Sequence, residues 1–465
     1  MNIKLKNIGI FKQTEYELGD LTIICGENNT GKTYATYSLY GFFDFWKKGF
    51  RLNISNADIS DLMEKGTLTI PFRRDIASLN ETLKNASSQY SKYLHRIIAA
   101  NEKYFEDSAI TIQIDDSDIS ILDTYEKRWG TAKNEMFQVS KEAGKDEISV
   151  SLLIDAKEVN TFSTRLNITN AISQALKDIL FKNTFCDTFI ASAERTGAVI
   201  FKKELNEEQN IILKEIVKSS EFDIDVILSK AYNSSYALPV KRNIDFIKKL
   251  EDVAKLESYI AKHHPEILNE FAEIIGGEYK IGREGLYYIP KNDKKIRLTM
   301  IESSSSVRSL LDIGFYLRYS AEKGDLLIVD EPELNLHPAN QRKLARLFAR
   351  LVNIGIKVFI TTHSDYIIKE LNTLIMLNHT KGSEHTKQLM HKFHYVENDL
   401  ISASQIKVFI SELSKVKIEG NSKSSNIQSL VAAEIDEFYG IEAKSFDKTI
   451  IEMNKIQESI ILDRK

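Results

Sequence analysis

Eight consecutive residues near the N-terminus have the types and the spacing that bind nucleotide phosphates. They are Gly26, Glu27, Asn28, Asn29, Thr30, Gly31, Lys32 and Thr33. The glycines let the backbone curl so that its N–H groups point at a β-phosphate, and Lys32 would neutralise the β- and γ-phosphates. The Thr33 hydroxyl would bind Mg²⁺. The segment therefore predicts a phosphate loop that holds ATP and Mg²⁺.

Two acidic residues later in the chain follow an apolar run. Residues 326–329 read Leu-Leu-Ile-Val, which predicts a central strand, and Asp330 and Glu331 come directly after it. At the end of such a strand Asp330 would hold the Mg²⁺, and Glu331 would act as the general base toward the attacking water. A buried strand that ends in two exposed acids is a frequent arrangement, so the phosphate loop upstream gives this pair its meaning.

A histidine and a group of serines complete the set of candidate residues. His363 follows the next expected strand, residues 357–360, and a neutral imidazole there can hydrogen-bond the terminal phosphate or the attacking water. Ser305 and Ser306 belong to a serine run that opens an apolar helix. Hydroxyl and N–H donors at a helix N-terminus suit an anion. On their own, a lone histidine and a serine run are more often solvated surface.

The elements that must position these residues alternate between strands and helices. Three short strands are expected before residue 26, and an aromatic-rich helix after residue 33. Strands and helices alternate again from 303 to 375, which indicates an α/β fold with a parallel sheet. Residues 205–275 are expected to be helical and residues 278–289 to form a hairpin. Residues 428–439 and 446–462 are expected to form two C-terminal helices after a flexible link.

The composition is that of an ordinary globular protein. The 465 residues are 43% hydrophobic and 28% charged, and the net charge of −4 gives no global basic field that would indicate nucleic acid. Two cysteines, Cys25 and Cys186, are too few for a disulfide framework or a zinc cluster. Neither a signal peptide nor a run of about 18 apolar residues is apparent. A cytoplasmic protein without membrane contact is therefore expected.

The phosphate loop, the serines, the acid pair and the histidine, in this order, resemble the ABC-type ATPase heads of the RecF, SMC and OLD group. The string Asp-Glu-Pro-Glu-Leu-Asn-Leu-His-Pro at 330–338 is characteristic of that group. The resemblance implies a parallel-sheet core, an antiparallel β lobe, a helical insertion and a helical C-terminal extension. It implies head lobes at 1–45 and 301–380, the β lobe and insertion at 46–300, and an extension for partner docking at 381–465.

The same resemblance implies a shared active site. Ser305 and Ser306 would contact the γ-phosphate bound by a partner subunit, so that a homo-oligomer encloses ATP between its heads and hydrolyses it slowly. The sequence departs from the group in two places. Ser306 stands where glycine is usual, and no glutamine of the kind that lines such sites is evident. Residues 188–197 resemble a stretch of the OLD-like branch and leave open whether Glu194 or Arg195 contacts nucleotide.

Within this group the chain resembles stand-alone ATPase subunits of bacterial anti-phage systems, first the PtuA subunits of Septu and next the AriA subunits of PARIS. The segment between Lys32 and Ser306 is too short for long coiled-coil arms, and a Cys-x-x-Cys zinc hook is missing. Residues 376–465 lack the acidic arrangement of a Toprim nuclease. The resemblance therefore implies a sensor or scaffold that restrains a separately encoded nuclease of the HNH or Toprim type.

Two other interpretations stay open. A RecF-like repair ATPase would clamp duplex DNA in a salt-sensitive manner. Its candidate contacts are the basic residues Lys47, Lys48, Arg51, Arg73, Arg74, Lys248 and Lys249. A structural scaffold would bind ATP with negligible turnover. Glu331 argues against the scaffold, because such a site has little use for a general base.

Overall fold

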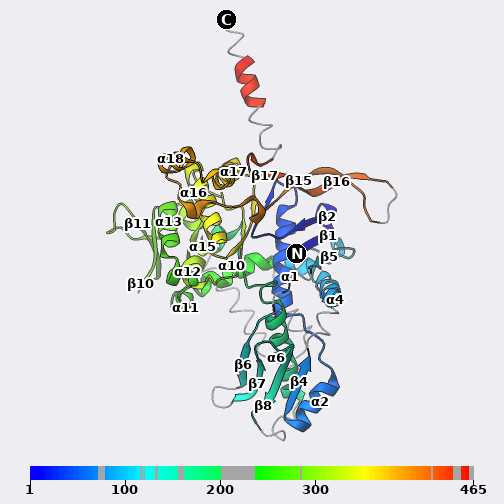
Figure 1. Cartoon of the computed structure of the whole chain (residues 1–465). Coiled ribbons are helices and arrows are strands. Elements are labelled where there is room, and N and C mark those ends of the chain that lie inside the picture. Colours follow the sequence, from blue (N-terminus) through cyan, green and yellow to red (C-terminus); the bar gives the residue numbers. More distant parts are fainter. Residues whose placement is uncertain are drawn as a thin grey trace. The chain divides into compact units, whose positions relative to one another are not determined.

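A computed structural model gives the fold of the chain (Figure 1). It describes residues 1–71, 79–115, 119, 121–130, 135–154, 162–200, 236–282, 285–419, 423–442 and 452–459. The expected helical stretch at 205–235 and the basic pair Arg73 and Arg74 therefore lie outside the described residues. The chain forms two compact units. The first comprises Met1–Ile3, Gly41–Tyr93 and Ala109–Asp187, and the second comprises Lys4–Tyr40, Leu94–Ser108 and Thr188–Lys465.

The second unit is built on a central sheet with the strand order β16-β15-β3-β14-β13-β9. The bounds of these strands are β3 (Leu21–Cys25), β9 (Thr188–Ala191), β13 (Leu326–Asp330), β14 (Lys357–Thr362), β15 (Ile406–Val416) and β16 (Ser425–Ala432). The strands from β15 to β9 run parallel, and β16 pairs antiparallel with β15 at one edge. The predicted α/β fold with a parallel-sheet core is confirmed.

The apolar strands of this sheet are buried along their whole length. Every residue of β3 and of β13 is buried, because helices cover the sheet as they do in parallel α/β folds. The covering helices are α1 (Lys32–Lys48), α16 (Pro338–Asn353) and α17 (Asp365–Thr380). On α16 the buried side chains include Leu344, Leu347 and Leu351, at the spacing of one helix face. Burial of this face fixes the helix on the sheet.

The register of the sheet sets the edge where functional groups can meet. Strand β14 lies between β3 and β13. Thr361 pairs with Asp330 on one side, and Thr362 pairs with Cys25 on the other. The carboxyl ends of β3, β14 and β13 are thus level with one another. Whatever follows these three strands in sequence is brought to one edge of the sheet, which is where ligands bind in open α/β folds.

The rest of the second unit surrounds this sheet. Two strands that neighbour each other in a further sheet come first, β1 (Asn2–Ile8) and β2 (Phe11–Glu17). Its further strands are β10 (Gly277–Gly282), β11 (Gly285–Pro290), β12 (Leu298–Thr299), β17 (Ile435–Asp436) and β18 (Gly440–Ile441). Its further α-helices are α5 (Leu94–Ile98), α7 (Arg195–Ile200), α10 (Leu238–Lys248), α11 (Leu250–Val253), α12 (Tyr259–His263), α13 (Pro265–Ile275), α14 (Ser305–Ser309), α15 (Leu311–Phe315) and α18 (Glu384–Lys392). Short turns of other helix types are η1 (Glu102–Tyr104), η3 (Tyr316–Ser320), η4 (Glu397–Asp399) and η5 (Ala403–Gln405).

The first unit contains an antiparallel sheet of order β4-β8-β7-β6. Its strands are β4 (Thr67–Pro71), β5 (Ala109–Gln113), β6 (Tyr125–Gly130), β7 (Glu135–Lys141) and β8 (Glu147–Leu152), of which β5 lies outside that sheet. Its helices are α2 (Asn56–Lys65), α4 (Leu79–Ser91) and α6 (Phe162–Phe181), together with the end of α1. Aromatic rings near that end pack together, for example Trp46 with Phe50 and with Phe185. The expected antiparallel β lobe and helices are therefore present.

Lys177 on α6 closes the end of α1 and gives a first prediction. Its Nζ donates hydrogen bonds to the carbonyl oxygens of Trp46 (2.7 Å), Lys47 (3.2 Å) and Phe50 (2.9 Å). Lys177→Met keeps most of the side-chain bulk but leaves buried carbonyls without a donor. We expect the free energy of unfolding to fall by about 3 kcal/mol, measured by urea denaturation. The exposed Lys182→Met variant serves as control and should change it by less than about 0.5 kcal/mol. Equal stability of the two variants would contradict the capping role.

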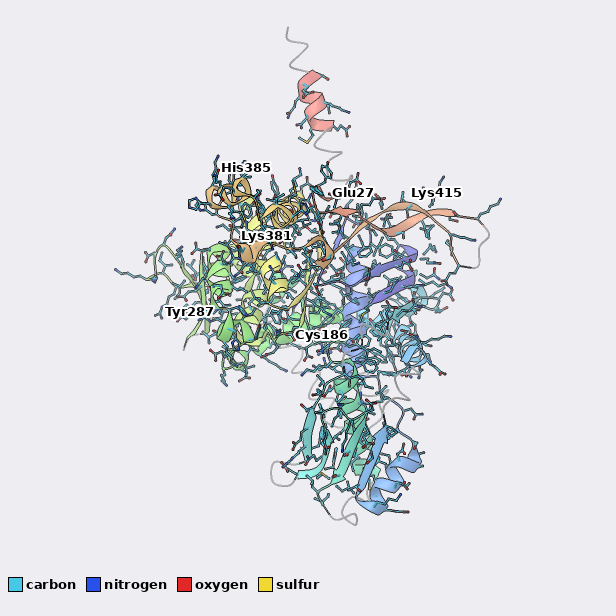
Figure 2. The ribbon with its side chains drawn as sticks, viewed as in Figure 1. Glu27, Cys186, Tyr287, Lys381, His385 and Lys415 are labelled. Carbon is cyan, nitrogen blue, oxygen red and sulfur yellow. The ribbon has the colours of Figure 1, made fainter. Side chains whose placement is uncertain are left out.

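The C-terminal part differs from its expectation. The predicted helix at 428–439 is wrong, because Ser425–Ala432 form β16 and pair with β15 from Phe409 to Val416. The region implied as a helical extension thus also supplies strands to the core sheet, while α18 and residues 452–459 are helical. Beyond its pairing with β3, β15 continues with β16 as a two-stranded ribbon, on which Lys415 lies (Figure 2).

Three smaller features complete the description of the fold. The hairpin expected at 278–289 is formed by β10 and β11. Cys25 and Cys186 are both buried, and no disulfide joins them. Among the helices that the structure describes, none is long and apolar enough to cross a membrane.

Candidate functional site

The phosphate loop lies between the end of β3 and the start of α1. Its lysine is turned back onto the loop: Lys32 Nζ donates to the carbonyl oxygens of Gly26 (2.9 Å) and Glu27 (2.7 Å). The Thr30 hydroxyl also donates to the Glu27 carbonyl, at 2.8 Å. The Lys32 side chain is buried, whereas Glu27, Asn28 and Asn29 are exposed. The loop is therefore a closed curl with its cation on the inside, as a phosphate cradle requires.

Two glycines are required by the shape of this curl. Gly26 has a φ of 146° and Gly31 a φ of 90°, both in the region that favours glycine. A Cβ on Gly26 would lie 2.8 Å from the Ser411 carbonyl oxygen on β15, and one on Gly31 would lie 2.7 Å from the ring of Phe11. The Ser411 hydroxyl also donates to the Thr30 carbonyl at 2.6 Å. Strand β15 thus braces the loop, and sequence reasoning missed this contact.

Asp330 ends β13 with one oxygen satisfied and one free. Its side chain is fully buried, and Oδ1 accepts a hydrogen bond from the Thr361 hydroxyl. Within the described residues, Oδ2 is buried and has no hydrogen-bond partner. Burial raises the pKa of Asp330 to about 6. A buried carboxylate oxygen without a donor is what a hard cation such as Mg²⁺ would satisfy, so the residue fits the metal.

Glu331 turns away from the strand line directly after Asp330. Its φ of 52° places it in the left-handed region, which is unusual for a residue with a side chain. The turn is held because the Glu331 N–H donates to the carbonyl and the hydroxyl oxygen of Thr361, at 3.2 and 3.1 Å. The side chain is 24% exposed. A partly solvated carboxylate at this place can reach a water molecule.

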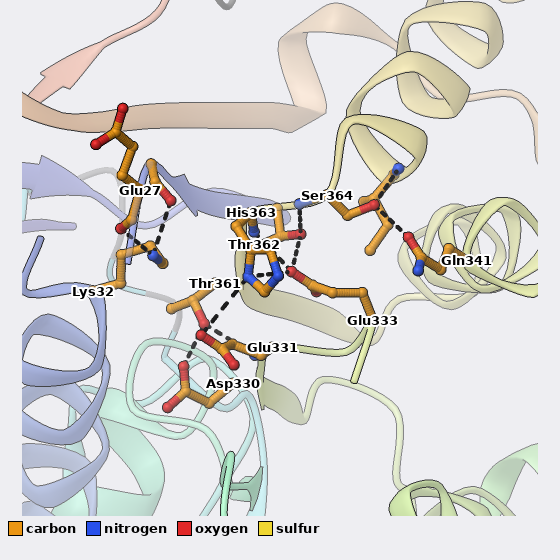
Figure 3. A network of polar contacts seen from close by, with 12 residues as sticks. Glu27, Lys32, Asp330, Glu331, Glu333, Gln341, Thr361, Thr362, His363 and Ser364 are labelled. Carbon is orange, nitrogen blue, oxygen red and sulfur yellow. Dashed lines mark hydrogen bonds and ion pairs between the residues drawn. The ribbon is translucent and has the colours of Figure 1, made fainter. Parts of the chain in front are cut away.

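His363 lies between two carboxylates (Figure 3). Its Nδ1 is 3.1 Å from Glu333 Oε1 and 3.8 Å from Glu331 Oε1. Glu333 is nearly buried, and the same Oε1 accepts from the Thr362 hydroxyl (2.9 Å) and the His363 N–H (2.7 Å). Burial raises the pKa of Glu333. Sequence reasoning missed Glu333, although its place in the Asp-Glu-Pro-Glu string was a signal.

The electrostatics tie these groups to the phosphate loop. Burial lowers the pKa of Lys32, and the carboxylates of Glu331, Asp330 and Glu333 act in the opposite direction. The lysine and the acids are therefore near enough to influence one another. Together with the level strand ends, this brings the loop, the acid pair and His363 to one site.

The serines are not part of that assembly within one chain. Ser304 caps α14 by accepting from the Val307 N–H (3.3 Å), and its hydroxyl lies 2.8 Å from the Ser306 hydroxyl. Ser305 is exposed and Ser306 is half-buried. In the part of the chain that the structure describes, neither Ser305 nor Ser306 makes a hydrogen bond to the phosphate loop. The structure therefore separates these two candidates from the others.

Glu194 and Arg195 have different surroundings. Arg195 is fully buried, and its guanidinium donates to backbone carbonyl oxygens rather than facing solvent. Glu194 is exposed, and it accepts a hydrogen bond from the Tyr37 hydroxyl at 2.8 Å. Arg195 is thus an internal connection and not a nucleotide contact.

A glycine-rich loop with an inward lysine, a strand-end acid pair and a histidine directly after the strand between them define a phosphate-loop nucleoside triphosphatase site in an α/β fold. The comparison with protein families agrees. The AAA ATPase domain family matches residues 1–368. This chain belongs to that family, and it is an ATPase-type protein.

Solved structures and curated proteins were also compared with the chain. An SMC head bound to the C-terminal winged-helix domain of ScpA is 11% identical, covers 93% of this chain and 97% of its own, and has a TM-score of 0.32. The SMC head domain from Thermotoga maritima is 8% identical, with 93% and 98% covered and a TM-score of 0.28. An SMC head with an extended coiled coil, bound to the C-terminal domain of ScpA from Pyrococcus furiosus, is 11% identical, with 98% of both covered and a TM-score of 0.29. No curated protein matches the chain.

Proposed function

We propose that the chain binds ATP with Mg²⁺ on Gly26–Thr33 and hydrolyses it. The observation that supports this most is the convergence of Lys32, Asp330 and Glu331 at one sheet edge, with the buried Asp330 Oδ2 left for a metal. Thr33, at the start of α1, and Asp330 would hold the Mg²⁺. When bound, Mg²⁺ neutralises charge that develops on the β- and γ-phosphates.

Glu331, His363 and Glu333 each have a separate role in the proposed hydrolysis. Glu331, partly solvated, takes the proton of the attacking water as general base. His363 Nδ1 lies 3.1 Å from Glu333 Oε1, so in a neutral imidazole this carboxylate favours the tautomer that carries its proton on Nδ1 and presents Nε2 as an acceptor. That acceptor suits a water molecule and orients it. Glu333, buried and hydrogen-bonded to the Thr362 hydroxyl and the His363 N–H, positions the histidine.

We further propose that each site is completed by a second copy of the chain. At the start of α14, Ser305 is exposed and Ser306 is half-buried, and the Ser306 hydroxyl lies 2.8 Å from the Ser304 hydroxyl. The resemblance to ABC-type heads implies that these serines contact the γ-phosphate of the ATP that a partner subunit binds. ATP then acts as a contact between two copies, and hydrolysis releases it. Turnover is expected to be slow, because it waits on association.

Ser306→Arg tests this shared site. The bulky cation blocks approach of a partner but leaves the subunit's own phosphate loop intact. We expect ATP affinity to stay within about threefold and turnover to fall about 100-fold, because a donor to the transferring phosphate is lost. Ser404→Arg is the matched control, since Ser404 is an exposed helical serine whose hydroxyl lies 2.9 Å from that of Ser402. Normal turnover by Ser306→Arg would contradict the shared site.

We propose that this ATPase regulates a separately encoded nuclease in bacterial anti-phage defence, as do the stand-alone heads that it resembles. Three features support this role: a complete set of ABC-type site residues, a segment between Lys32 and Ser306 that is too short for coiled-coil arms, and no Toprim-like acidic arrangement in residues 376–465. Expression of the tagged chain together with its neighbouring genes tests it. We expect a nuclease to co-purify with the tagged chain in the presence of Mg-ATP, and to be lost from the Lys32→Ala variant. A chain that retains no neighbouring gene product under either condition contradicts it.

A further inference from the structure

Arg195 is the largest side chain that is fully buried among the described residues. Burying a guanidinium costs several kcal/mol unless its donors are satisfied, and well-packed apolar residues often stabilise such positions better. Nε donates to the Ser309 carbonyl at 2.6 Å, and Nη1 donates to the Ser192 carbonyl at 2.9 Å. The fork geometry of arginine thus joins separate backbone segments, which a lysine or an apolar residue could not do.

Two of the joined segments belong to the two halves of the proposed site. Nη1 donates to the Asp330 carbonyl at 2.7 Å, and Nη2 donates to the Glu331 carbonyl at 2.9 Å. These residues serve the ATP that the subunit itself binds. Ser309, bound through Nε, ends α14, whose first residues serve the ATP of the other copy. One guanidinium therefore holds the metal and base residues against the helix that carries the serines.

Ser309 extends this connection. Its single hydroxyl hydrogen can be donated to the Ser306 carbonyl, at 3.0 Å, or to the Leu334 carbonyl, at 3.2 Å. Leu334 follows the acid pair by a few residues. A shift of the Asp330–Leu334 segment would therefore be transmitted toward Ser306 in two ways. One is through Arg195, which binds the Ser309 carbonyl, and the other is through the Ser309 hydroxyl.

The neighbouring residue, Glu194, contacts the helix that follows the phosphate loop. Glu194 accepts from the Tyr37 hydroxyl at 2.8 Å, and Tyr37 lies on α1 one turn after Thr33. Tyr37 is almost fully buried, and its pKa is raised well above its ordinary value, first by burial and then by the charge of Asp330. Displacement of α1 by bound phosphates would thus be transmitted to the Glu194–Arg195 pair.

We propose that Tyr37, Glu194 and Arg195 form a relay that couples nucleotide on a subunit's own phosphate loop to the position of α14, the helix offered to the second copy. These are positioning residues. The inference rests on the proposed function, because it assigns α14 to the partner's ATP. ATP on one subunit's phosphate loop then positions that subunit's α14 to complete the active site of the other subunit.

The relay acts within one subunit, so it is tested with subunits kept apart by Ser306→Arg. Amide hydrogen exchange of residues 309–317 is measured with and without Mg²⁺ and a non-hydrolysable ATP analogue, whose binding is measured in parallel. The analogue should slow exchange about threefold or more in this background. Adding Tyr37→Phe or Glu194→Gln should abolish the slowing and leave analogue affinity within about threefold. Both substitutions keep the side-chain shape, so the fold is expected to persist.

Tyr34→Phe is the matched control, because Tyr34 lies on the same helix and its ring packs against Gly9. It should keep the slowing. Equal slowing in Tyr37→Phe and in the control overturns the relay, as does a background that binds the analogue without any change in exchange. A background that fails to bind the analogue contradicts the proposed function itself, and the relay falls with it.

Discussion

Lys32→Ala is expected to weaken ATP binding by about 100-fold or more, because the lysine supplies charge-assisted contacts to two phosphates. In the structure its Nζ is held inside the loop by the carbonyl oxygens of Gly26 and Glu27. Phosphates would replace these weaker acceptors. Alanine removes the cation that balances Asp330, Glu331 and Glu333 and leaves their repulsion toward phosphate. Equilibrium binding of a fluorescent ATP analogue with Mg²⁺ measures the effect.

The control for this variant is Lys12→Ala, an exposed lysine on β2. It should bind the analogue as the parent does. If Lys32→Ala binds within about threefold of the control, the loop is not the phosphate site, and the assignment of Gly26–Thr33 fails.

Glu331→Gln is expected to lower kcat by about 10²–10⁴-fold, the contribution of a positioned general base. ATP affinity should be retained, because the phosphate loop and Asp330 are unchanged. ATP then binds without being hydrolysed. A dimer should therefore accumulate with Mg-ATP but not with Mg-ADP. Single-turnover hydrolysis and mass measurements on the same sample give both results.

Glu333→Gln separates the base from its neighbour. Glu333 is buried, and its Oε1 is used by Thr362 and His363, so it has no access to carry a proton away. The amide keeps one acceptor oxygen. We therefore expect kcat to fall by only about tenfold, because His363 is positioned less firmly. If kcat falls more in Glu333→Gln than in Glu331→Gln, then Glu333 is the general base and Glu331 is not.

Sequence patterns were sufficient for the parts of the site that local chemistry dictates. The loop needs glycines at Gly26 and Gly31 and a lysine next to them, whatever surrounds it. The acid pair and His363 follow apolar strands, and parallel strands bring their carboxyl ends to one edge. Motif order along the chain thus predicted which groups meet.

Contacts made through the backbone or across long separations could not be predicted in this way. Arg195 binds carbonyl oxygens, which every residue carries, so no pattern marks its partners. Strand β16 was expected to be helical because its short run of Leu430, Val431 and Ala432 suits either element. What decides it is pairing with β15 and the Thr14 hydroxyl, which accepts from the Leu430 N–H some four hundred residues away in sequence. Tertiary contacts override local preference there.

The central claim is that an active site takes its phosphate loop from one subunit and its serines from another. Mixing two inactive variants tests it directly: Lys32→Ala, and a double variant Ser305→Ala with Ser306→Ala, which removes both serine hydroxyls without adding the bulk that blocks a partner. In a mixed dimer one site would combine the intact Lys32 of one subunit with the intact Ser306 of the other. An equimolar mixture should recover about a quarter of the parent's ATP turnover, since about half of the dimers are mixed and each holds one whole site. Turnover no higher than the sum of the two variants alone would contradict the account.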